Sequence, residues 1–85
     1  MNNISTNLIP GHLYVTKLRV HIFDKQLARW TDLPEKEILL FMGEGDPNLH
    51  YQQLTFLFNT HIIRYYQYHR EAYACPLTLL FNKLS

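Results

Sequence analysis

Polar and apolar positions alternate in one early part of the chain. Leu18, Val20 and Ile22 occupy every second position of residues 18–23, which is the period typical of a β-strand with one buried face. Residues 12–17 alternate in the same way. We therefore expect either one bent strand or two short strands in this region.

The next part of the chain is predicted to contain a loop, a turn and a strand. Residues 24–32 are too short a segment for a helix, and we expect a loop with room for one helical turn. Residues 33–37 indicate a polar turn, because Pro34 fixes its own φ and the charged residues beside it favour water. The apolar run at 38–42 predicts a compact strand, and the glycines and proline within residues 43–47 end it.

The segment 51–68 fits two different structures. A helix would carry a partial apolar stripe that includes Leu54 and Phe58, whereas two strands would place Leu54, Phe56 and Phe58 on one shared face. The many aromatic residues and isoleucines of the segment favour strands, and Asn59 and Thr60 are typical of a turn. A hairpin is therefore the favoured interpretation. The alternative, a helix over 51–70, would make the fold α+β.

These segments together predict an all-β protein. Residues 77–84, which follow Cys75 and Pro76, form a last strand or a short helix. Five short strands separated by Pro and Gly turns are typical of a small closed or partly closed barrel rather than a sandwich. With 85 residues the chain has room for one core. We expect a flexible N-terminal tail at 1–8 and one domain at 9–85.

Four segments, taken in order, resemble a known family. They are residues 11–15 (Gly-His-Leu-Tyr-Val), 22–24 (Ile-Phe-Asp), 37–44 (Glu-Ile-Leu-Leu-Phe-Met-Gly-Glu) and 57–63 (Leu-Phe-Asn-Thr-His-Ile-Ile). Their order and spacing resemble small SH3-like barrel proteins encoded by tailed bacteriophages. The resemblance implies a five-stranded, partly closed SH3-like barrel of viral origin. It also implies an interaction module, and it transfers no catalytic residue.

Composition and charge narrow the function classes further. Hydrophobic residues make up 47% of the chain and charged residues 18%, which excludes an intrinsically disordered protein. A net charge of +1 provides no strong attraction to nucleic acid or to anionic lipid, and no apolar run is long enough to span a bilayer. Cys75 is the single cysteine, so no intrachain disulfide can form. We expect a cytoplasmic protein, in the host cytoplasm if it is viral.

Catalysis, metal binding and a bound cofactor are not expected. The five histidines lack the i, i+4 spacing and the Cys/His patterns of metal sites. No nucleophile elbow or phosphate-binding loop is present. The sequence therefore predicts a protein that is not an enzyme.

The most unusual stretch is residues 61–73, which is rich in tyrosine, arginine and histidine. In a strand, Arg64, Tyr66 and Tyr68 point to one side, and Tyr65 and its alternate neighbours point to the other. Only one of these sets can belong to the core. The other set presents aromatic surface, which a monomer without a partner seldom needs.

Tyrosine, tryptophan and arginine dominate the hot spots of protein interfaces. The candidate partner-binding residues are therefore Arg64, Tyr66, Tyr68, Arg70 and, in the expected loop, Trp30. The favoured function is a protein-binding module, and for a phage product a modulator or inhibitor of a host protein. Two alternatives stay open: a barrel that binds single-stranded nucleic acid, and a structural or assembly subunit that forms a homo-oligomer.

Overall fold

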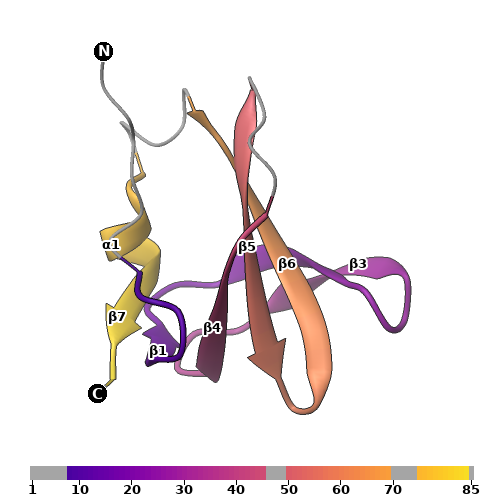
Figure 1. Ribbon diagram of the computed structural model, residues 1–85, viewed down its shortest axis with the longest axis horizontal. Helices are drawn as coiled ribbons and strands as arrows, with labels where there is room; N and C mark the ends of the chain where they lie inside the picture. Colours follow the sequence, from indigo (N-terminus) through magenta and orange to yellow (C-terminus); the bar gives the residue numbers. More distant parts are fainter. Residues whose placement is uncertain (1–7, 46–49, 70–74, 85) are drawn as a thin grey trace.

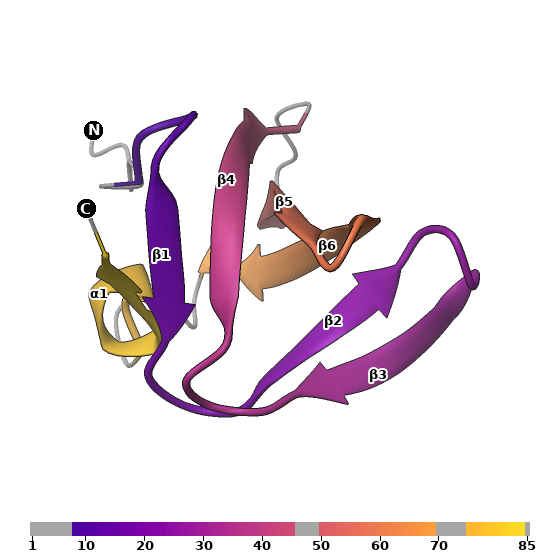
Figure 2. The same ribbon diagram turned by 90° about the horizontal axis from the view of Figure 1, so that it is seen from below.

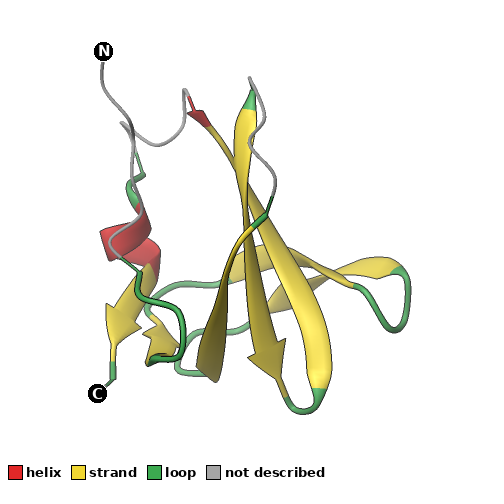
Figure 3. Ribbon diagram, in the orientation of Figure 1, coloured by secondary structure: helices red, strands yellow, loops and turns green. Residues whose placement is uncertain are grey.

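The computed structural model describes residues 8–45, 50–69 and 75–84, and it places them in one antiparallel β-sheet with a single α-helix (Figures 1 and 3). The elements in chain order are β1 (Leu13–Thr16), β2 (Val20–Asp24), β3 (Arg29–Leu33), β4 (Ile38–Glu44), β5 (Tyr51–Phe58), β6 (His61–Tyr68), α1 (Leu77–Leu80) and β7 (Phe81–Lys83). The all-β prediction is confirmed. The predicted tail lies almost wholly outside the described residues, and Leu8, at its end, is buried in the core.

The seven strands lie in the order β3-β2-β6-β5-β4-β1-β7. Strands β4, β5 and β6 form a meander, and β7 returns to pair with β1. The sheet curves strongly, but its edge strands β3 and β7 do not pair with each other, so the sheet is not closed (Figure 2). The prediction of five strands was too low, because β3 and β7 extend the sheet at its two ends.

The core fills the concave side of the sheet. Tyr14 and Thr16 point inward from β1 although both are polar, because each has hydrogen bonds there. The Tyr14 hydroxyl accepts the backbone N–H of Ile9 at 2.7 Å. Thr16 donates to the Pro34 carbonyl and accepts from the backbone N–H of Glu37. The buried hydrophobic residues are Leu8, Tyr14, Val20, Ile22, Leu33, Leu39, Phe41, Leu54, Phe56, Ile63, Leu77, Leu80 and Phe81.

Residues 24–32 form a β-hairpin, so the prediction of a loop with a helical turn was wrong. The Asp24 carboxylate accepts the backbone N–H groups of Gln26 and Leu27 and thereby stabilises a tight turn. Ala28 completes the turn with a φ of 53°. Strand β3 then pairs with β2 over all of its five residues, and Trp30 lies in a strand rather than in a loop.

Residues 51–68 form the favoured hairpin, and the alternative of a helix over 51–70 was wrong. Asn59 and Thr60 both have positive φ, as a two-residue turn of type I′ requires. Strands β5 and β6 pair over eight residues without a register shift. Strand β4 is longer than predicted, because a bulge lets Gly43, at a φ of 132°, continue the pairing with β5.

The end of the chain contains both of the elements that the sequence allowed. Helix α1 turns Leu77 and Leu80 into the core, and β7 follows it directly. Within the described ranges, no helix is long and apolar enough to cross a membrane.

Candidate functional site

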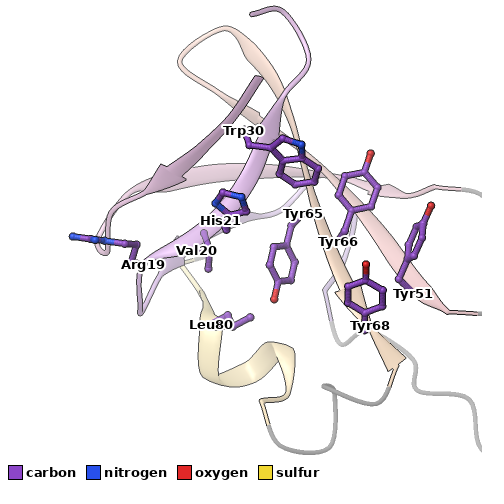
Figure 4. Close-up of a pocket in the computed structure, with 9 residues that line it drawn as sticks. All are labelled: Arg19, Val20, His21, Trp30, Tyr51, Tyr65, Tyr66, Tyr68 and Leu80. Atoms are coloured by element: carbon purple, nitrogen blue, oxygen red, sulfur yellow. The ribbon is translucent and has the colours of Figure 1, made fainter. Parts of the chain in front are cut away.

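An open groove lies where strands β2 and β6 separate. These two strands pair only at Phe23 with Arg64 and at Asp24 with Ile63, near the tip of the β2–β3 hairpin. Beyond those pairs the strands diverge, and the space between them has a volume of about 600 Å³ (Figure 4). We call this space the aromatic groove. It is lined by Arg19, Val20, His21, Trp30, Tyr51, Tyr65, Tyr66, Tyr68 and Leu80.

Trp30 forms one wall of the aromatic groove and is 52% exposed. Its indole stacks on the His21 ring with a centroid distance of 5.2 Å and an interplanar angle of 6°. Nδ1 of His21 in turn donates to Oδ1 of Asp32 at 2.8 Å, and the Phe23 ring supports the indole at 5.3 Å. The tryptophan is therefore held in place while half of its surface is in water.

Three tyrosines extend this wall across the sheet. The Tyr66 ring lies 5.7 Å from the Trp30 ring and 5.4 Å from the Tyr51 ring. Tyr68, which is 49% exposed, lies 6.0 Å from Tyr51. These separations fall in the range of favourable aromatic pairs. One continuous row of four rings therefore reaches from the edge strand β3 to β5.

The floor of the groove belongs to the hydrophobic core. Val20 and Leu80 are buried there, and the Tyr65 ring packs against Phe81 at 5.8 Å. Arg19 stands at one end of the groove with its guanidinium pointing away from the rings (Figure 4). None of the described lining residues is acidic, so the groove is apolar and aromatic with one positive charge at its end.

The structure brings together three of the five predicted site residues. Trp30, Tyr66 and Tyr68 share the groove although Trp30 is far from the other two in sequence. Arg64 lies on the same face of β6, but opposite Phe23 and Thr55 rather than in the groove. Its Nε is buried and has no hydrogen-bond partner among the described residues. Arg70 lies outside the described residues.

The sequence analysis did not identify His21, Tyr51 and Tyr65 as site residues. Tyr51 could have been found, because counting outward from a turn at Asn59 and Thr60 places it opposite Tyr68, as the structure does. His21 had no such signal. Its place depends on the pairing of β2 with β3, a hairpin that the sequence analysis missed.

A second histidine–carboxylate pair lies outside the groove. Nδ1 of His61 lies 2.8 Å from Oδ2 of Asp24. The hydrogen bond from His61, together with the backbone N–H groups of Leu27 and Gln26, holds the pKa of Asp24 below its usual value, although burial opposes the shift. This pair joins the β2–β3 turn to β6. In the described ranges no three His, Cys, Asp or Glu side chains lie close enough together to hold a metal ion.

The arrangement is therefore suited to binding, through a fixed aromatic surface beside an apolar groove. Comparisons with known proteins assign no family: no family model, no curated protein and no solved structure matches the chain.

Proposed function

We propose that this chain is a non-enzymatic protein-binding module and that the aromatic groove is its binding site. The observation that carries the proposal is the row formed by Trp30, Tyr66, Tyr51 and Tyr68 beside the 600 Å³ groove. Trp30 and Tyr68 are about half exposed although both are large and aromatic. Such residues contribute most of the binding energy in protein interfaces when a partner buries them.

The rigidity of the row favours binding. All four rings stand on strands, and each touches at least one other ring of the row. Little side-chain freedom is therefore left to lose when a partner covers them, and that loss is one of the main costs of association.

The finer fold assignment is part of the same proposal. We propose an SH3-like barrel in which β1, the meander β4–β6 and β7 form the five barrel strands, with β2 and β3 inserted as an arm between β1 and β4. The return of β7 to pair with β1 supports this assignment. The resemblance to phage proteins makes a bacterial protein the first class of partner to test.

A pull-down from bacterial lysate tests the proposal. The lysate is divided into two halves, one of which is treated with nuclease, and the tagged chain is added to each. We expect one stoichiometric protein that nuclease does not remove. In a titration with that protein, Trp30→Ala and Tyr66→Ala should each weaken binding by about 2 kcal/mol or more, a loss of roughly thirty-fold.

The matched control is Leu27→Ala. Leu27 is 51% exposed in the β2–β3 turn and does not line the groove, so this variant should bind like the wild type. Circular dichroism must show that the groove variants stay folded. Unfolding of both would identify the row as core packing and remove the proposal, as would unchanged binding by folded variants.

A second candidate function is binding of single-stranded nucleic acid. The observation in its favour is that four neighbouring rings lie in a row, with Arg19 at the end of the groove and no acidic lining residue among those described. Bases stack on such rings at about 1–3 kcal/mol each. This function would be favoured instead if nuclease removed the material captured in the pull-down and if the affinity fell steeply with salt concentration.

A further inference from the structure

The aromatic groove is bordered by two strand edges, one on each side. The ladder between β2 and β6 includes a hydrogen bond from the backbone N–H of Lys25 to the Ile62 carbonyl at 3.0 Å, and it ends at the Phe23–Arg64 pair. Backbone groups in an antiparallel ladder point to the same neighbour at every second residue. His21 and Tyr66 would be the next residues to bond across the ladder.

Within the described residues, His21 and Tyr66 are not paired with each other. Their backbone N–H and C=O groups therefore face the groove from its two sides. The odd-numbered residues of β6 point the other way, toward β5, as the bond from His69 N–H to the His50 carbonyl shows. The groove is thus a split within the sheet, and the main-chain groups of His21 and Tyr66 face it.

These edges have few of the features by which proteins protect exposed strands, and Arg64 is the one arginine on them. Neither the 20–23 edge nor the 64–68 edge contains proline or lysine, and the β5–β6 register has no bulge that would twist β6 away. Unprotected edges of this kind pair with strands of other chains.

We propose that the aromatic groove binds its partner as an added β-strand, an extended segment of another protein that lies between β2 and β6 and bonds to the main chain of His21 and Tyr66. This inference rests on the proposed function and specifies how that site recognises its partner. Side chains of the inserted strand alternate between the two faces. Those that point inward meet Val20, Tyr65 and Leu80, and those that point outward separate the Trp30 and Tyr66 rings, which lie 5.7 Å apart without the partner.

The lining also specifies the chemistry of the segment. Its inward positions suit apolar side chains, because Val20 and Leu80 are buried core residues. Its end near Arg19 suits a carboxylate, because Arg19 is the charged lining residue and no described lining residue is acidic. The partner is therefore an extended acidic segment with an apolar residue inside the split.

The test uses peptides selected from a random phage-displayed library on the full chain. We expect selected peptides to be acidic and apolar, and to bind about tenfold more weakly to Arg19→Glu. Arg29→Glu is the matched control, since Arg29 does not line the groove, and it should bind normally. N-methylation at alternate peptide positions should lower affinity by about tenfold at each, because each methyl group removes one main-chain hydrogen bond.

Amide hydrogen exchange provides a second measurement. The bound peptide should slow exchange at His21 and Tyr66, while Ile63, which is already paired with β5, should stay unchanged. If peptides need Trp30 but tolerate every N-methyl group and leave exchange at His21 and Tyr66 unaltered, strand insertion is wrong and the proposed function survives. Failure to select any groove-binding peptide, or preference for an oligothymidine over every peptide, also overturns the inference. Failure of the pull-down alone counts against the proposed function.

Discussion

At the scale of single residues, Asp24 has the most definite electrostatic role. Its side chain is almost fully buried, and its two oxygens accept from His61 and from the backbone of the β2–β3 turn. Gln26 reinforces the same junction, because its side-chain oxygen accepts the backbone N–H of Ile62. The carboxylate therefore helps to hold the hairpin that carries Trp30 against β6.

The lowered pKa of Asp24 predicts how stability depends on pH. A carboxyl group whose folded pKa lies below its unfolded value, here 3.8, contributes stability that is present above that value and is lost as the pH falls through the folded pKa. We expect the free energy of unfolding of the wild type, measured with urea, to fall as the pH is lowered from about 5 to below 3.8. Asp24→Asn should be less stable at neutral pH and should show a flatter dependence in that window. If the free energy of unfolding had the same pH dependence in both proteins, with the same urea m-value, Asp24 would not be the source of the effect.

The sequence predicted individual site residues where chemistry alone singles them out. Trp30, Tyr66 and Tyr68 stood out because tryptophan, tyrosine and arginine dominate the hot spots of protein interfaces, and all three line the groove. Arg64 stood out for the same chemical reason but lies beside the groove. The sequence does not show where β2 and β6 separate. The structure keeps them paired at Phe23 and Arg64, which leaves Arg64 beside the groove.

At the scale of elements, hairpins with a standard turn were predictable. Asn59 and Thr60 marked the β5–β6 turn, and the structure gives them φ values of 50° and 65°. The β2–β3 hairpin was missed because its turn has no glycine and no Asn-Gly pair. Two backbone N–H groups that donate to Asp24 and the positive φ of Ala28 make it instead. The same carboxylate is also bound by the side chain of His61, which is distant in sequence.

The β5–β6 turn predicts a stabilising substitution. Thr60 is β-branched and has a φ of 65°, a conformation that costs ordinary residues about 1–2 kcal/mol. Thr60→Gly creates the preferred Asn-Gly pair of a type I′ turn, and the larger chain entropy of glycine offsets only part of the gain. We expect the free energy of unfolding to rise by about 0.5–1 kcal/mol.

Thr55→Gly is the matched control, because Thr55 lies in β5 between two paired strands, and it should lower stability by roughly the same amount. A loss of stability in Thr60→Gly would show that the turn is not strained.

At the scale of the whole molecule, the two ends of the strand order have very different burial. Strand β3 has one buried residue, Leu33. At the other end β7 begins with Phe81, which is 3% exposed and packs on Phe56 with ring centroids 4.9 Å apart. One core nevertheless connects the ends, because Leu33 belongs to the same cluster of buried residues as Phe81. The sequence could not predict that β7 shares this core, since a strand of three residues after a short helix has no periodic pattern of its own.

The shared core predicts that damage at β7 unfolds the whole sheet. Phe81→Ala should cost about 3–5 kcal/mol, which is a large part of the roughly 4–13 kcal/mol expected for a domain of this size. Trp30 is the single tryptophan and lies on β3, so its fluorescence reports the end of the sheet that is farthest from the substitution in strand order. We expect urea transitions followed by Trp30 fluorescence and by far-ultraviolet circular dichroism to shift together in this variant.

The control is Leu79→Ala, in α1 at 47% exposure, which should change stability by no more than about 0.5 kcal/mol. If Trp30 kept its wild-type transition while the circular dichroism changed, the β2–β3 arm would fold independently of β7, and the aromatic groove would bring together two separately stable parts.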